Sequence, residues 1–305
     1  MLPGRCRARR ACATTPSGRR TRWWCRMPGG DERFSHKAAV RAGVLRFYAG
    51  QPLDVNGERV GALCIADDSP RELSEEQVAL LGDLAHLVEV ELSRTRELWQ
   101  AAEVQRRLLP ATSPDLPGFD VAGRCVQARV VGGDFFDWHV TDGHLQLVIA
   151  DVMGKGLSAA ILAASVRATL RVATRFNPLD VAVTKAAASI ADDFEDPGTF
   201  VTAFLVSLDY RTGRLEYIDA GHGLAIIIDA SGEARRLIGE YPPFGIDLGH
   251  AWHTQEGVLE PGETLIAVSD GFMDFFDDPW DSIGAAAEVT AKATSASGLV
   301  DDFID

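Results

Sequence analysis

Hydrophobic and polar residues alternate in two short stretches near the start of the ordered pattern, and this alternation predicts two β-strands. The stretches are Val44–Ala49 and Arg59–Ala66. Asn56-Gly57 lies between them, and this dipeptide favours the tight turn of a hairpin because both residues tolerate positive φ. We therefore expect a β-hairpin in this part of the chain.

After Leu73 the hydrophobic period changes to that of a helix. Ser74 and Gln77 have the spacing of a capping box, in which each side chain bonds the backbone N–H of the other residue. The next proline is Pro110, so one helix of about 36 residues, roughly 54 Å long, is predicted. The pattern places this linker helix at residues 74–110.

Small and apolar residues recur along the linker helix at alternating spacings of four and three, which is a coiled-coil period. The positions are Leu81, Ala85, Val88, Leu92, Thr95, Trp99 and Ala102. Two interpretations stay open. This face either lies on its own domain or pairs with the same helix of a second copy, which would make a homodimer.

Three hydrophobic segments in the second half of the chain each lead to an aspartate, at Asp134, Asp151 and Asp270. A carboxylate at the end of a strand is rigidly aimed, as a metal ligand must be. Each aspartate alone is also typical of an ordinary turn. Three that converge would repel one another unless cations neutralise them, and ligation by oxygen alone selects Mg²⁺ or Mn²⁺ over zinc.

Other residues near these segments give weaker evidence for a functional site. Gly154-Lys155 is not a P-loop, because that motif needs a glycine five positions earlier and Ser or Thr directly after the lysine. The stretches 199–209 and 215–220 predict a second hairpin. His222 follows it, and holding the turn is the favoured role over catalysis.

Charge is distributed unevenly along the 305 residues. The formal net charge is -14, yet residues 1–30 hold eight arginines and no acid. The remaining body is strongly acidic and would repel a phosphate backbone, so nucleic acid is not expected as a partner. Residues 1–30 show no helix or strand period and are interpreted as an aberrant or disordered basic segment.

Cysteine usage and hydrophobicity bear on the compartment. The five cysteines are odd in number and fit no zinc spacing, so we expect free thiols. No apolar run approaches the roughly 20 residues that cross a bilayer, and no secretory signal is evident. These features predict a cytoplasmic protein with no membrane partner.

The motifs around the aspartates resemble those of the PPM-type (2C-like) serine/threonine phosphatases, in the SpoIIE/RsbU branch. They occur in the family's order, and the resemblance covers the chain from about residue 103 to its end. The carrying segments are Val131–Asp137, Asp151–Gly156, Phe200–Thr202, Ala220–His222, Ser269–Gly271, the lead-in Val104–Pro110 and Tyr241–Gly245.

This resemblance implies an α+β fold, an αββα sandwich of two antiparallel sheets flanked by helices. It implies a protein phosphatase that hydrolyses phosphoserine or phosphothreonine with water activated between two Mn²⁺ or Mg²⁺ ions. Asp134, Asp151 and Asp270 would be the catalytic metal ligands, joined by the carbonyl of Val152, with Asp137 as an outer candidate. The implied substrate is a phosphorylated STAS-type anti-sigma factor antagonist or a similar phosphoprotein.

Residues 33–98 resemble the C-terminal half of a GAF sensor domain, through Arg46–Leu53, Gly61–Asp67 and the turn at Pro70–Leu73. We therefore divide the chain into four parts: the basic segment 1–30, an incomplete α/β GAF-like domain at 31–98, the linker helix 74–110, and a phosphatase domain at 115–305. The family's last strand, which carries another metal ligand, has no counterpart, and we expect a domain truncated at its C-terminus.

Two other functions compete with this interpretation. Gly132–Phe135 resembles the Gly-Gly-Asp-Glu-Phe hairpin of diguanylate cyclases, but the glutamate is missing and Asp151 and Asp270 would have no role. A non-catalytic regulator that binds the phosphorylated partner without turnover is the main alternative.

Overall fold

The computed structural model describes residues 23–25, 34–192, 194, 198–246, 251–276 and 279–304. The chain separates into two units, Met1–Glu97 and Leu98–Asp305, and each is described by itself. Apart from residues 23–25, the basic segment 1–30 lies outside the described residues, as do Cys6 and Cys12. Cys64 and Cys125 are free thiols.

The first unit is built on a three-stranded antiparallel sheet in the order β1-β2-β3. The strands are β1 (Trp23–Cys25), β2 (Phe47–Val55) and β3 (Glu58–Asp67), and the short helix α1 is Ala38–Arg41. Asn56 and Gly57 both have positive φ, 50° and 81°, so the predicted hairpin turn is confirmed. No strand was expected at Trp23–Cys25, and that interpretation is wrong because these residues pair with β2.

Helix α2 (Glu75–Leu108) begins and ends where the sequence predicts. Gln77 Oε1 accepts from the Ser74 N–H at 2.9 Å, and Ser74 Oγ accepts from the Gln77 N–H at 3.2 Å, which completes the capping box. Leu81 is buried against the β2–β3 sheet, whereas the Trp99 side chain is 58% exposed. The face of α2 with the coiled-coil period is therefore buried at Leu81 and exposed at Trp99.

The second unit contains two antiparallel sheets. The five-stranded sheet has the order β10-β7-β6-β5-β4, and the three-stranded sheet has the order β11-β8-β9. The elements are β4 (Phe135–Thr141), β5 (His144–Val152), α3 (Leu157–Phe176), α4 (Leu179–Asp192), β6 (Val201–Asp209), β7 (Arg214–Ala220), β8 (Ala225–Ile228), β9 (Ala234–Arg236), β10 (Gln255–Val258), β11 (Thr264–Ala267), α5 (Asp270–Met273), α6 (Pro279–Lys292) and α7 (Ala296–Asp302).

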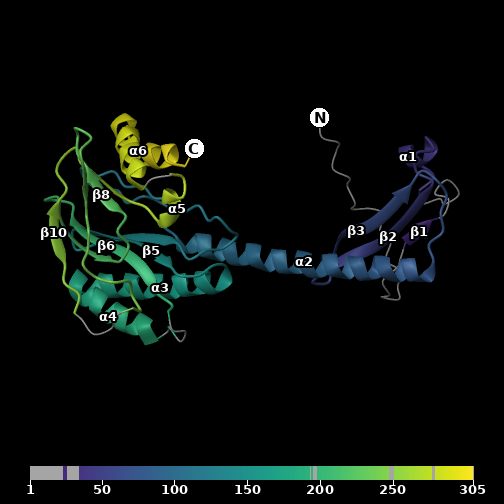
Figure 1. Cartoon of the computed structure of the whole chain (residues 1–305), viewed down its shortest axis with the longest axis horizontal. Helices are drawn as coiled ribbons and strands as arrows, with labels where there is room; N and C mark the ends of the chain where they lie inside the picture. The colour runs from purple at the N-terminus through teal and green to yellow at the C-terminus, as the bar shows by residue number, and fades with distance from the viewer. Residues whose placement is uncertain are drawn as a thin grey trace. The chain divides into compact units, whose positions relative to one another are not determined.

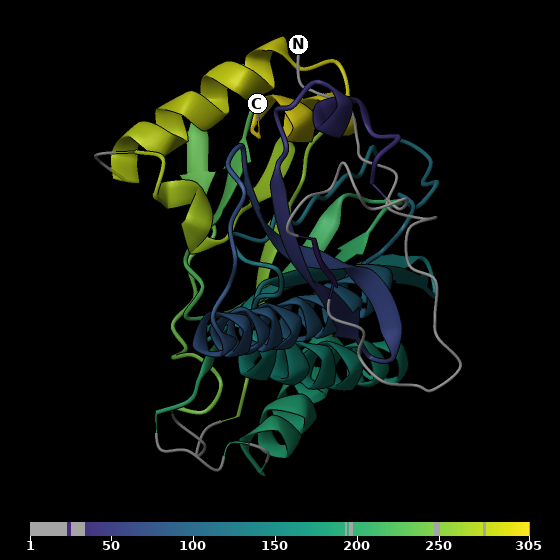
Figure 2. The ribbon, with the colours of Figure 1, turned by 90° about the vertical axis from the view of Figure 1, so that its right-hand side faces the viewer.

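Three layers of buried side chains hold these elements together. One lies between α3, α4 and the five-stranded sheet, a second lies between the two sheets, and a third joins the small sheet to α6 and α7. Figures 1 and 2 show the teal helices α3 and α4 and the yellow helices α6 and α7 on opposite sides of the strands. The αββα sandwich is thus confirmed.

Helix α3 is 20 residues long and apolar enough, by length and composition alone, to cross a membrane. The sequence analysis expected no such segment. Its buried residues, which include Ala163, Val166 and Leu170, pack in the core against the five-stranded sheet. Two of its arginines, Arg167 and Arg171, form ion pairs with Asp137 on β4. The contacts identify α3 as a core helix of the sandwich.

Candidate metal centre

Asp134, Asp151 and Asp270 meet at one place in the second unit. Each offers a carboxylate oxygen, and these three oxygens lie within 4.8 Å of one another. Asp134 directly precedes β4, Asp151 is the second-last residue of β5, and Asp270 begins α5. Asp134 and Asp151 are 17 positions apart, and their strands form the β4–β5 hairpin. Asp270 lies 119 positions after Asp151 and is placed by the segment that follows β11.

One detail of the expected arrangement is wrong. The hydrophobic segment that leads to Asp134 contains Val130 and Val131 and is apolar enough to predict a strand, but residues 128–131 form bends. Val131 is instead buried against Ala102 of α2 and Ala160 of α3. Asp134 is therefore positioned by the strand that follows it and by packing of the segment before it.

Gly133 allows the close approach of the two backbones that carry Asp134 and Asp151. A Cβ atom at this position would lie 2.4 Å from the Val152 carbonyl oxygen and 3.1 Å from Asp151 Oδ1. Real Cβ atoms do not come so close to a backbone oxygen, so a side chain here would push the aspartates apart. The Val152 carbonyl, predicted as a metal ligand, lies at this same contact.

Burial and mutual repulsion raise the pKa of two of the carboxyls. Burial, followed by the Asp270 charge, raises the pKa of Asp134 to about 6, although a hydrogen bond from Ser269 lowers it. Burial and the charges of Asp134 and Asp270 raise the pKa of Asp151 to about 7. The three carboxylates therefore share a place where negative charge is unfavourable.

These residues fit a hard divalent cation. The donor set is three carboxylate oxygens, which is the chemistry that Mg²⁺ and Mn²⁺ prefer. Asp134 Oδ1 is buried and has no hydrogen-bond partner among the described residues. A buried acceptor without a partner is costly, and a cation held by the cluster would remove that cost.

Two glutamines hold the segment that precedes Asp134. Gln105 on α2 donates from Nε2 to the Gly132 carbonyl at 2.6 Å, and its Oε1 accepts from the Gly132 N–H at 3.3 Å. Gln127 donates to the Asp134 carbonyl at 3.1 Å. The linker helix is thus hydrogen-bonded to a residue two positions from a candidate ligand.

The sequence analysis assigned Gln105 no role, although a signal was present. Leu98, Ala101 and Ala102 form the face of α2 that packs on the second unit, and Gln105 lies three and four positions further along. Residues at these spacings share one helix face. A polar residue in line with an apolar face indicates a specific hydrogen bond.

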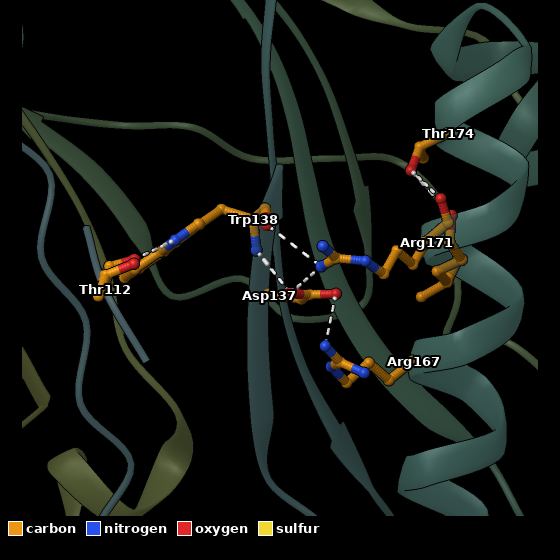
Figure 3. Close-up of polar contacts among 7 residues, drawn as sticks. Thr112, Asp137, Trp138, Arg167, Arg171 and Thr174 are labelled. Atoms are coloured by element: carbon orange, nitrogen blue, oxygen red, sulfur yellow. Dashed lines mark hydrogen bonds and ion pairs between the residues drawn. The ribbon is translucent and has the colours of Figure 1, made fainter. Parts of the chain in front are cut away.

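Asp137, the outer candidate, is not part of the cluster of three. Its side chain is 2% exposed and lies between two arginines of α3, with Oδ1 2.5 Å from Arg171 Nη1 and Oδ2 3.3 Å from Arg167 Nη2. It also accepts from the Trp138 N–H at 2.9 Å (Figure 3). These contacts tie α3 to β4.

His222 lies in the turn after β7 with 8% of its surface exposed. The buried Asp219 carboxylate organises this turn by accepting from the N–H groups of His222 and Gly223. The His222 ring approaches Thr202, with Nδ1 3.5 Å from Oγ1. Thr202 pairs with Asp151 across β6 and β5. The turn is therefore linked to a candidate metal ligand through Thr202.

Comparison with known proteins gives two family matches. The sequence model for Stage II sporulation protein E (SpoIIE) matches residues 141–305, which is more than half of the chain. The model for the GAF domain matches residues 3–92.

Curated relatives include protein IcfG of Synechocystis, which is 30% identical over 58% of this chain and 32% of its own length. Phosphoserine phosphatase RsbU of Bacillus subtilis is 24% identical over 57% of this chain and 52% of its own. The chain thus spans about a third to a half of the relatives it matches.

Two solved structures are similar in fold. The RsbU and RsbW domains of a Mycobacterium tuberculosis protein superpose with a TM-score of 0.51 at 25% identity, covering 59% of this chain and 52% of that one. The SiaA-PP2C domain of Pseudomonas aeruginosa superposes with a TM-score of 0.57 at 21% identity, covering 70% and 89%.

Removing one charge from the cluster is expected to stabilise the cation-free protein at alkaline pH. Folding raises the pKa of Asp151 from 3.8 to about 7, so ionisation opposes folding and stability is lost as pH rises through about 7. Asp151→Asn should therefore raise the free energy of unfolding at about pH 8 in chelator, measured with urea, and should give no gain near pH 4. Asp142→Asn, in the exposed turn of the same hairpin, is the control. A less stable Asp151→Asn protein at pH 8 would contradict the assigned repulsion.

Loss of the Gln105 hydrogen bonds is expected to weaken cation binding at the cluster. Gln105→Ala frees Gly132, and with net contributions of about 1 kcal/mol per hydrogen bond the Mn²⁺ affinity should fall roughly three- to tenfold. Isothermal titration measures this affinity. Gln100→Ala, the same change at an exposed position of α2, should leave it unchanged. Equal affinities for the two variants would show that the linker contact does not position Asp134.

Proposed function

This chain belongs to the Stage II sporulation protein E (SpoIIE) family, and on that premise we propose that it is a metal-dependent protein serine/threonine phosphatase. The observation that carries the proposal is the convergence of Asp134, Asp151 and Asp270 within 4.8 Å. The relatives RsbU and RsbP of Bacillus subtilis are both named phosphoserine phosphatases.

Asp134, Asp151 and Asp270 would hold Mn²⁺ or Mg²⁺ through their carboxylates, with the Val152 carbonyl as a further ligand. Bound there, the cations would supply charge neutralisation for the phosphate and a lowered pKa for water. The chain's own contribution is placement. Gly133 brings Asp134 close to Asp151, and the β5–β6 pairing fixes the direction of Asp151. Hydrolysis of the phosphoserine ester then gives serine and inorganic phosphate.

The properties of Cys125 favour water, and not a cysteine thiolate, as the nucleophile. Its Sγ lies 3.7 Å from the Asp134 carbonyl oxygen, near enough to be considered as a nucleophile. Burial, with the neighbouring Asp134 charge, raises the pKa of the Cys125 thiol to about 11. The thiol is therefore neutral near pH 7 and is a poor nucleophile.

We propose that the substrate is a phosphorylated regulatory protein of the STAS-type anti-sigma factor antagonist class. The support is that the relatives RsbU and RsbP are named phosphoserine phosphatases, together with the presence of RsbU and RsbW domains in one Mycobacterium tuberculosis protein. The protein would act in the cytoplasm.

Regulation by the N-terminal part is proposed through α2. The GAF match covers residues 3–92, and α2 continues from that part to Gln105, which bonds Gly132. Leu92 and Trp99 on the heptad face are exposed, at 42% and 58%. These side chains are available for pairing with α2 of a second copy in a homodimer.

Hydrolysis of a phosphoserine protein should require Mn²⁺ or Mg²⁺ and should be abolished by Asp151→Asn. The reason is that the amide removes one of the three carboxylates that converge to hold the cations. Phosphate release from a phosphorylated antagonist measures the activity, with Asp142→Asn as the matched control. Full turnover by Asp151→Asn, or in excess chelator, would refute the proposal. Binding of the phosphoprotein without turnover by the wild-type chain would identify a non-catalytic regulator instead.

A further inference from the structure

An apolar pocket lies between the three-stranded sheet and helices α5 and α6. Its walls include Ile226 of β8, Ile266 of β11, Phe272 and Met273 of α5, and Ile283 of α6. The cavity volume among these side chains is about 120 Å³.

The pocket is a local opening in an otherwise covered sheet face. Ile228, two residues from Ile226 on the same face of β8, is 1% exposed and packs in the core with α6 and α7. Ile226 and Ile266 pair directly across β8 and β11, and each is 9% exposed. All three isoleucines are thus buried, Ile228 most completely, and the pocket lies at Ile226 and Ile266.

The segments that line the pocket also carry the candidate metal centre. Val268 and Phe272 line the pocket and lie two residues before and two residues after Asp270. Since consecutive Cα atoms are about 3.8 Å apart, two residues span less than about 8 Å. One short segment of the chain therefore supplies both a wall of the pocket and a candidate metal ligand.

A cation lies at the rim of this apolar pocket. Arg236 lines it, is exposed, and donates from Nη2 to the Gly223 carbonyl at 2.7 Å. A fixed guanidinium favours an acidic group on whatever enters. The chemistry that fits is an apolar side chain with a carboxylate beside it.

We propose that this pocket binds an apolar side chain of the phosphoprotein substrate, one to three residues from the phosphoserine, with Arg236 pairing with a flanking acidic residue. The inference rests on the proposed phosphatase function and adds a determinant of sequence specificity to it. The pocket and the carboxylate cluster would read two neighbouring residues of one substrate segment.

A set of phosphoserine peptides tests the proposal. Each carries one leucine at a single position within three residues of the phosphoserine, in an alanine background, and kcat/KM is measured with Mn²⁺. Because an apolar pocket discriminates by roughly ten- to two-hundredfold per lost contact, leucine at one favoured position should raise kcat/KM at least about tenfold over the all-alanine peptide. An adjacent aspartate should add to the gain, and Arg236→Gln should remove that addition.

Two isoleucine variants assign the selectivity to the pocket. Ile226→Ala removes a wall of the pocket and should reduce the leucine-to-alanine ratio of kcat/KM about fivefold or more. Ile228→Ala makes the same change two residues away, outside the pocket, and should leave the ratio unchanged even though it lowers stability. A ratio that changes equally in both variants would overturn the proposal.

The outcomes separate this inference from the proposed function. Suppose that the enzyme hydrolyses p-nitrophenyl phosphate and all peptides, but with no preferred leucine position or with the same gain at every position. That result would overturn the pocket assignment while the phosphatase function stands. If no substrate is hydrolysed, the phosphatase proposal fails. The pocket is then tested by fluorescence anisotropy of the labelled peptides with Mn²⁺, where position-dependent tightening supports it and equal affinities overturn it.

Discussion

The repulsion among Asp134, Asp151 and Asp270 is the constraint on which the rest of the structure depends. Three carboxylates within 4.8 Å oppose folding unless protons or cations neutralise them. Burial and the charges of neighbouring carboxylates raise the pKa values of Asp134 and Asp151 because ionisation is unfavourable at these positions. A site that destabilises the apo protein in this way gains when a hard cation binds, so its arrangement is better explained by cation binding than by fold stability.

The scaffold maintains this arrangement by contacts outside the cluster. The central β5 holds Asp151 through pairing on both sides, with β4 and β6, and Gly133 removes the side chain that would keep the backbones apart. Asp137 joins β4 to α3 through Arg167 and Arg171, while Gln105 joins α2 to Gly132. The linker helix therefore contacts the segment that leads into one candidate ligand, Asp134.

The sequence predicted correctly those structures that depend on a few adjacent residues. The Asn56-Gly57 turn and the Ser74–Gln77 capping box depend on a few adjacent residues, and both formed as expected. Val130-Val131 read as a strand because it is apolar and β-branched, yet its burial is against Ala102 and Ala160, which tertiary packing alone decides. The same holds for Asp137, whose partners Arg167 and Arg171 lie 30 and 34 positions further along the chain, on α3, and could not be inferred from the motif around it. Convergence of the three aspartates was inferred from strand ends. The apolar face of α2 marks Gln105, but its partner Gly132 and the bond from Gln127 to Asp134 required the fold.

The central claim is that the three carboxylates bind divalent cations in common. Crystals grown with Mn²⁺ and measured at the manganese absorption edge test it directly, because the anomalous signal locates the metal without reference to activity. The account predicts anomalous peaks among Asp134, Asp151 and Asp270, with carboxylate oxygens at about 2.1 Å, the distance typical of a small hard cation. A saturating Mn²⁺ concentration that gives no peak at these carboxylates would contradict it.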